Sequence, residues 1–203
     1  HFEDQAIKLK KLFYKYKARR LIIDGNGLGI GLMDYMVKQQ IDTETNEIFP
    51  DFGVYNDDEA YYKKYQTANC EQNAVYIIKA NAPINTEAHA NAQTQLSSGK
   101  VKFLQDERLA KVKLMGTKLG QNMKPEERAE YLKPFTLTSI LKEEMMNLRE
   151  NNEGVNIILE RANKGIKKDK FSAFEYGLYY IKHEEDSKKK KKKFNAKDWC
   201  FLN

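Results

Sequence analysis

Hydrophobic residues at the start of the chain recur at the spacing of a helix, with lysines filling the positions between them. Phe2, Ala6, Leu9, Phe13 and Tyr16 follow one another at intervals of three or four residues. That repeat predicts an amphipathic helix over about residues 2–16, with its apolar side packed on a core and its lysines in solvent.

A short unbroken apolar run follows at residues 21–23 and ends on the carboxylate of Asp24. Such a run predicts a strand that is buried on both faces. Four glycines stand at every second position after it, and apolar residues at helical spacing then predict a helix through about Gln40. A buried strand, an acid at its end, a glycine turn and a helix are typical of an α/β ligand site.

Later apolar runs and repeats predict further strands and helices. Strands are expected at residues 75–78, 101–104 and 155–159. Helices are expected over 60–69, 86–96 and 109–119, from Pro125, from a cap at Thr136 or Thr138, and from Asp169. The polar stretch 41–58 predicts a loop. Strands near 21, 75 and 155, separated by helices, predict an α/β layered fold with a partly parallel sheet.

Composition narrows the class of protein without deciding its function. The chain has 203 residues, of which 41% are hydrophobic and 32% charged, enough for one substantial core. Its net charge of +6 suits a polyanionic partner. Cys70 and Cys200 have no zinc-site spacing, which favours a reduced, intracellular setting, and no apolar run reaches membrane-spanning length. Residues 187–203, with six lysines in a row, are expected to form a solvated basic tail.

The role of Asp24 has three possible interpretations. A nucleotide site is disfavoured, because Ile30 stands where a dinucleotide fingerprint needs its third glycine, and because the chain has no Walker A loop. Asp24 could be a metal ligand, since a carboxylate is a hard oxygen donor suited to Mg²⁺ or Mn²⁺. It could also simply cap the turn that follows. The metal interpretation needs a second carboxylate from elsewhere in the chain.

Asp169 is the candidate for that second carboxylate. It is expected at the start of a helix, where an N-cap role alone would explain an aspartate. The two roles are compatible, because one carboxylate oxygen can accept from a helix amide while the other faces a cation. Four lysines surround it, at Lys164, Lys167, Lys168 and Lys170.

Four segments of the sequence resemble a known protein family. The runs LIIDGNGLGIGLMDYMV, VYIIKAN, TSILKEEMMNL and KKDKFSAFEYGLYYI are similar to the nuclease domain of the terminase large subunit of tailed bacteriophages. They occur in the family's order and span roughly residues 1–186, which we therefore take as one expected domain. The first and last runs are the specific ones.

The resemblance implies an RNase H-like fold with a mixed sheet flanked by helices and an acidic cluster that binds two divalent metal ions. By match, Asp24 and Asp169 would be catalytic metal ligands. Asp34, Gly25 and Gly27 also match and would have structural or supporting roles. The family has a further acid on an upstream strand that no position here matches, so we expect a chain that lacks the domain's opening strands and the preceding ATPase motor.

The implied function is that of a Mg²⁺- or Mn²⁺-dependent endonuclease that cleaves concatemeric double-stranded DNA in a viral packaging motor. Two ions about 4 Å apart would activate a water and neutralise the leaving oxygen. The four lysines around Asp169 would meet DNA phosphates, although each alone could equally be a solvated loop residue. Expected partners are DNA, the terminase small subunit and the portal protein, in the host cell cytoplasm. The alternative is a non-catalytic RNase H-like module that binds DNA or portal.

Overall fold

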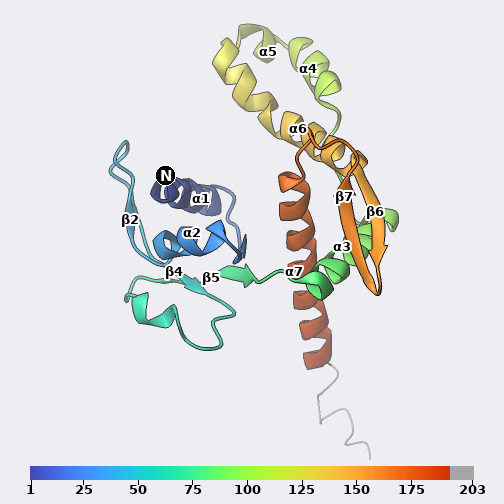
Figure 1. Ribbon diagram of the computed structural model, residues 1–203. Helices are drawn as coiled ribbons and strands as arrows, with labels where there is room; N and C mark the ends of the chain where they lie inside the picture. Colours follow the sequence, from blue (N-terminus) through green and yellow to red (C-terminus); the bar gives the residue numbers. More distant parts are fainter. Residues whose placement is uncertain (193–203) are drawn as a thin grey trace, which may run out of the picture. The chain divides into compact units, whose positions relative to one another are not determined.

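The structure is a computed structural model that describes residues 1–192 (Figure 1). The chain divides into two compact units, His1–Asn81 and Ala82–Asn203. The domain predicted over residues 1–186 spans both units, and its existence as one body stays a prediction. The predicted tail boundary at residue 187 falls inside the last helix, and the tail's residues 193–203 lie outside the described part.

The first unit is a small parallel sheet with two main helices. In chain order its elements are α1 (Phe2–Lys15), β1 (Leu21–Asp24), α2 (Leu28–Met36), β2 (Gln40–Ile41), β3 (Ile48–Phe49), β4 (Phe52–Val54), a 3-10 turn (Lys63–Tyr65) and β5 (Glu71–Ile78). The sheet order is β1-β5-β4, and both pairings are parallel. β2 and β3 form a separate antiparallel pair. The register places Asp24 opposite Ile78, so the carboxyl ends of β1 and β5 coincide.

A single hydrophobic core holds this unit together. Ala6 and Phe13 of α1 meet Met33 and Met36 of α2 over Phe52 of the sheet. α1 and α2 lie side by side (Figure 1). Ala6 and Phe13 of the apolar repeat are buried, which confirms the helix predicted there, whereas the expectation that its lysines lie in solvent is wrong for Lys10.

One cation is buried in the same core. Lys10 is fully buried, and its Nζ donates to the backbone carbonyls of Lys38 at 2.6 Å and Pro50 at 2.7 Å. The ammonium also lies 4.9 Å from the centre of the Phe52 ring. Burial lowers the pKa of Lys10 to about 8, although the nearby charge of Asp51 opposes that shift. Lys10 therefore ties α1 to the chain on both sides of the β2–β3 pair.

The second unit is mostly helical. Its elements are α3 (Ala82–Ser97), α4 (Glu107–Met115), α5 (Lys118–Asn122), α6 (Pro125–Met146), β6 (Leu148–Glu153), β7 (Asn156–Arg161) and α7 (Asp169–Lys192). β6 and β7 form an antiparallel hairpin that turns at Gly154, which has a φ of 61°. α3 packs against both α7 and β7. The hairpin is thus fixed from one side by a helix.

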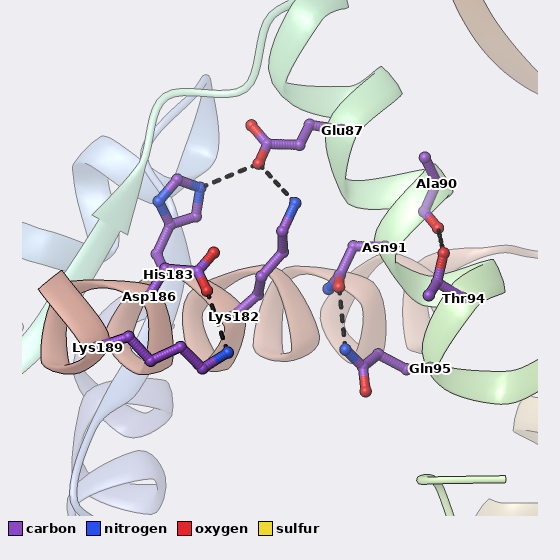
Figure 2. A network of polar contacts seen from close by, with 9 residues as sticks. All are labelled: Glu87, Ala90, Asn91, Thr94, Gln95, Lys182, His183, Asp186 and Lys189. Carbon is purple, nitrogen blue, oxygen red and sulfur yellow. Dashed lines mark hydrogen bonds and ion pairs between the residues drawn. The ribbon is translucent and has the colours of Figure 1, made fainter. Parts of the chain in front are cut away.

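Polar contacts join α3 to α7. His89 Nδ1 lies 2.5 Å from Glu175 Oε2, and both side chains are largely buried. Near the surface, Glu87 Oε1 accepts from Lys182 at 3.1 Å and lies 3.4 Å from His183 Nε2 (Figure 2). These contacts fix how the two helices are aligned along their lengths.

The α/β class is confirmed, whereas several element boundaries were wrong. The strands at 21–24 and 75–78 and the helix over 86–96 are present. The helix after the glycines ends at Met36, before the predicted Gln40. The stretch 41–58 is not one loop, because it contains β3 and β4, and β4 is a strand of the main sheet.

Further predictions were wrong in both units. Residues 101–104 form no strand, and the helix over 60–69 is only the 3-10 turn. Thr136 and Thr138 start no helix, because both donate their hydroxyls to carbonyls one turn back within the continuous α6. β7 pairs with β6 and with no strand of the parallel sheet. An RNase H-like arrangement therefore stays a prediction.

None of the helices in residues 1–192 combines the length and the apolar character needed to cross a membrane.

Candidate functional site

Asp24 ends β1 with its side chain exposed at the carboxyl edge of the parallel sheet. Its Oδ1 accepts a hydrogen bond from the backbone N–H of Asn26 at 3.0 Å. Asp24 therefore does cap the turn, as one of the three interpretations expects. Within residues 1–192 its second carboxylate oxygen has no hydrogen-bond partner. One oxygen orients the side chain, and the other remains available for a cation.

The turn after Asp24 is pinned to the end of β5. The N–H of Gly25 donates to the carbonyl of Ile78 at 2.7 Å, and Asn26 Nδ2 donates to the carbonyl of Ala80 at 2.9 Å. A Cβ placed on Gly25 would stand 3.6 Å from Cγ of Lys79, so that lysine lies beside the turn. Asn26 was missed by the sequence reasoning. It belongs to the candidate site because it fixes the turn that carries Asp24.

The structure gives a different reason for the presence of each of these glycines. A Cβ on Gly25 would come within 2.4 Å of Ile77 Cγ2, and one on Gly29 within 1.7 Å of the carbonyl oxygen of Asp24. Both glycines are therefore required for close packing of the turn and of α2. Gly27 differs, because it has a φ of 55° and open space around it. The space around Gly27 would allow a ligand to approach the backbone beside Asp24.

Asp34 lies in the last turn of α2, and its side chain is exposed. Burial raises the pKa of Tyr62, and the neighbouring Tyr61 and Asp34 add to that shift. The structural or supporting role expected for Asp34 stays a prediction.

Asp169 is the first residue of α7, as predicted, and its side chain is exposed. The first amides of this helix are capped by a different acid. Oε2 of Glu144, which is 2% exposed, accepts from the N–H groups of Lys170 at 2.8 Å and Phe171 at 2.9 Å. Within residues 1–192 the carboxylate of Asp169 has no hydrogen bond. The alternative role of Asp169 as a helix cap is therefore taken by Glu144.

The four candidate DNA-binding lysines fall into two pairs. Lys168 Nζ donates to the carbonyl of Leu159 at 3.4 Å, and Lys170 Nζ lies 3.5 Å from Glu144 Oε1. Lys164 and Lys167 are exposed, and their ammonium groups contact no partner within residues 1–192. Lys164 and Lys167 can therefore bind a phosphate without breaking an existing contact.

Asp24 belongs to the first unit and Asp169 to the second, and their convergence on one metal site stays a prediction. Among residues 1–192, no three His, Cys, Asp or Glu side chains are grouped so that they could hold a metal ion. The resemblance itself assigns this chain only two of the family's acids.

Comparison of the chain with protein-family models, with curated proteins and with solved structures finds no match.

Proposed function

We propose that this chain is part of a metal-dependent DNA endonuclease of a viral packaging terminase, and that Asp24 and Asp169 hold its Mg²⁺ or Mn²⁺ ions. The observation that carries the proposal is the state of these two carboxylates. Each is exposed at the end of a regular element, and each has an oxygen without a hydrogen bond within residues 1–192. A hard divalent cation prefers such oxygen ligands.

Both acids are held in place by neighbours that leave them free to bind. The Asn26 amide orients Asp24, and the hydrogen bonds of Asn26 and Gly25 to the end of β5 fix that turn. Glu144 caps α7, so the carboxylate of Asp169 does not need to accept hydrogen bonds from the helix amides. The positive end of the α7 dipole also favours a negative charge at Asp169.

Metal ions at these acids would supply an activated water and neutralise charge on the leaving oxygen of a phosphodiester. The side chains of this chain have the other tasks. Lys164 and Lys167 would bind phosphates on either side of the cleaved bond, without reading the base sequence. Lys79, beside the Asp24 turn, would contact a phosphate on that edge of the sheet. The DNA, the terminase small subunit, the portal protein and the host cytoplasm belong to the same proposal.

The direct test is manganese binding to the full 203-residue chain, followed by NMR. Paramagnetic Mn²⁺ at low occupancy should broaden the amide signals of Asn26 and Gly27 together with those of Lys170 and Phe171. Asp24→Asn should abolish the broadening at both segments. The matched control is Asp58→Asn, an exposed aspartate of the same unit without a role in the proposed site, which should change nothing. Broadening at only one of the two segments, or broadening that survives Asp24→Asn, would refute a shared site.

The alternative function is a module that binds DNA without cutting it. It is favoured by the net charge of +6 and by the exposed ammonium groups of Lys164 and Lys167. Plasmid nicking in Mn²⁺ separates the two proposals. Nicking that Asp24→Asn removes supports the endonuclease. DNA binding that depends on Lys167, with no metal-dependent broadening at Asp24, supports the binding module.

A further inference from the structure

A pocket of about 450 Å³ opens at the end of β1 opposite to Asp24. It lies within the first unit, between the end of α1, the loop 17–20 and the start of β5 at Glu71 and Gln72. Its volume falls in the range of roughly 300–1,000 Å³ that is usual for small-molecule sites. Asp24 ends a strand that Arg20 precedes, and four extended residues span about 13 Å. The pocket is therefore distinct from the candidate metal site and does not rest on the proposed function.

Three cations line this pocket: Lys17, Arg19 and Arg20. The Arg20 guanidinium is held by its surroundings, because it lies 4.5 Å from the centre of the Tyr55 ring and Nη1 donates to the carbonyl of Arg19 at 3.1 Å. Within residues 1–192 the other donors of this guanidinium have no acceptor. A guanidinium that is fixed in place and short of acceptors is suited to bind an anion.

Lys17 follows the end of α1 with a φ of 48°. Glycine is the usual residue at this left-handed position, and a side chain there costs about 1 kcal/mol or more. Backbone strain of this kind is often kept where the side chain has a function. Basic residues near a helix carboxyl end also balance the helix dipole, which amounts to only about half a charge. Without Arg19, the charges of Lys17 and Arg20 still exceed the sum of that half charge and the single negative charge of Glu71.

The remaining walls offer an aromatic surface and hydrogen-bond acceptors. Tyr14 is 40% exposed as a residue, and its hydroxyl donates to Glu71 Oε2 at 3.1 Å. Burial and that hydrogen bond raise the pKa of Tyr14 to about 12, so the phenol stays neutral. Gln72 adds an exposed amide. Aromatic side chains stack on nucleic-acid bases, and carboxylate and amide groups bind base edges or sugar hydroxyls.

We propose that this pocket binds a nucleoside phosphate. The phosphate lies against Lys17, Arg19 and Arg20, the base stacks on Tyr14, and Glu71 or Gln72 accepts from the sugar or the base. The nucleotide can be free or can belong to the end of a nucleic-acid strand, since the recognised group is the same in both cases.

The test is a titration of the full chain with dAMP, in EDTA and at about 0.15 M salt, where the Debye length is about 8 Å. Amide signals of residues 14–20 and of Glu71 and Gln72 should shift. Lys17→Glu and Arg19→Glu should each weaken dAMP binding at least tenfold. The matched control is Lys15→Glu, which makes the same charge change in the last turn of α1, outside the pocket lining, and should weaken binding less than threefold.

Two further ligands decide which part of the nucleotide is recognised. Deoxyadenosine should bind at least tenfold more weakly than dAMP, and a short oligonucleotide with a 5′-phosphate should shift the same amides if a strand end is the source. Equal affinity for deoxyadenosine and dAMP would overturn the proposal. So would equal losses for Lys15→Glu and Lys17→Glu, or no saturation up to about 10 mM dAMP. Because EDTA is present, none of these results depends on the metal site.

Discussion

Glu144 is the residue whose replacement tests the architecture around Asp169 most sharply. It lies near the end of α6, is 2% exposed, and accepts from two backbone N–H groups at the start of α7. Glu144→Ala removes that acceptor and leaves both N–H groups of Lys170 and Phe171 without their partner. It also leaves the Lys170 ammonium without its carboxylate.

The expected loss can be worked out from these contacts. A buried donor left without an acceptor costs about 1–3 kcal/mol, and two such donors at a helix end that water can partly reach should together cost about 3–4 kcal/mol. The side chain of Lys170 is 40% exposed, so the loss of its carboxylate partner should add little to that cost. Glu144→Gln keeps one oxygen acceptor and loses only the charge, so it should cost about 1–2 kcal/mol.

Two measurements check this prediction. Urea denaturation followed by circular dichroism gives the change in unfolding free energy, and hydrogen exchange reports the amides of Lys170 and Phe171 individually. Both amides should lose protection in Glu144→Ala. The matched control is Glu143→Ala, an exposed neighbour on the same helix, which should stay within about 0.5 kcal/mol of the wild type. A Glu144→Ala variant as stable as Glu143→Ala, with both amides still protected, would refute the capping argument.

Three further predictions concern the first unit. Gly29→Ala should lower the unfolding free energy in urea by more than about 3 kcal/mol, because its Cβ would overlap the Asp24 carbonyl. Gly27→Ala should lower it by only about 1 kcal/mol, because the strain comes from the positive φ alone. Similar losses for the two variants would contradict the packing argument. Lys17→Gly should stabilise the chain by about 0.5–1 kcal/mol in the same assay while weakening dAMP binding, and a loss of stability would count against strain at that position. The pKa of Lys10 is about 8 in the folded chain and 10.5 in the unfolded chain, so the unfolded chain binds more protons between these pH values. The unfolding free energy of the wild type, relative to that of Lys10→Met, should therefore rise by about 2 kcal/mol from pH 8 to pH 10. A difference that does not change with pH would contradict the burial of this ammonium.

The sequence predicts those parts of the fold that local pattern determines. The strand ending at Asp24 is an unbroken apolar run, and the first helix has a regular apolar repeat, so both were found with their correct ends or nearly so. β4 was missed because it has only three residues, the middle one is Gly53, and so short a segment shows no periodicity. It forms because Val54 pairs with Val75 of β5, a contact distant in sequence.

The same distinction explains which candidate site residues the sequence could indicate. Asp24 and Asp169 were identified because each stands at a junction of elements that the sequence marks. Glu144 was missed, although it lies one helical turn after Ile140 and Leu141, on the side of α6 that the apolar residues define. An acid on such a side is itself a signal, because a buried carboxylate must have donors nearby. The sequence around Glu144 did not indicate that its donors are backbone N–H groups at the start of a helix 26 residues later.

The capping by Glu144 also bears on why an aspartate stands at position 169. If α7 relied on Asp169 for its cap, replacing that residue would destabilise the helix and remove any metal ligand at once, and the two roles could not be separated. Because Glu144 supplies the acceptor, Asp169→Ala should leave urea stability within about 0.5 kcal/mol of the wild type. Under the proposed function it should nevertheless abolish the Mn²⁺ broadening at Asn26 and Gly27. A stability loss of 1 kcal/mol or more, about the value of a helix cap, would mean that Asp169 caps α7 after all. Unchanged stability together with unchanged broadening would leave Asp169 with neither role and would remove the pairing on which the endonuclease proposal depends.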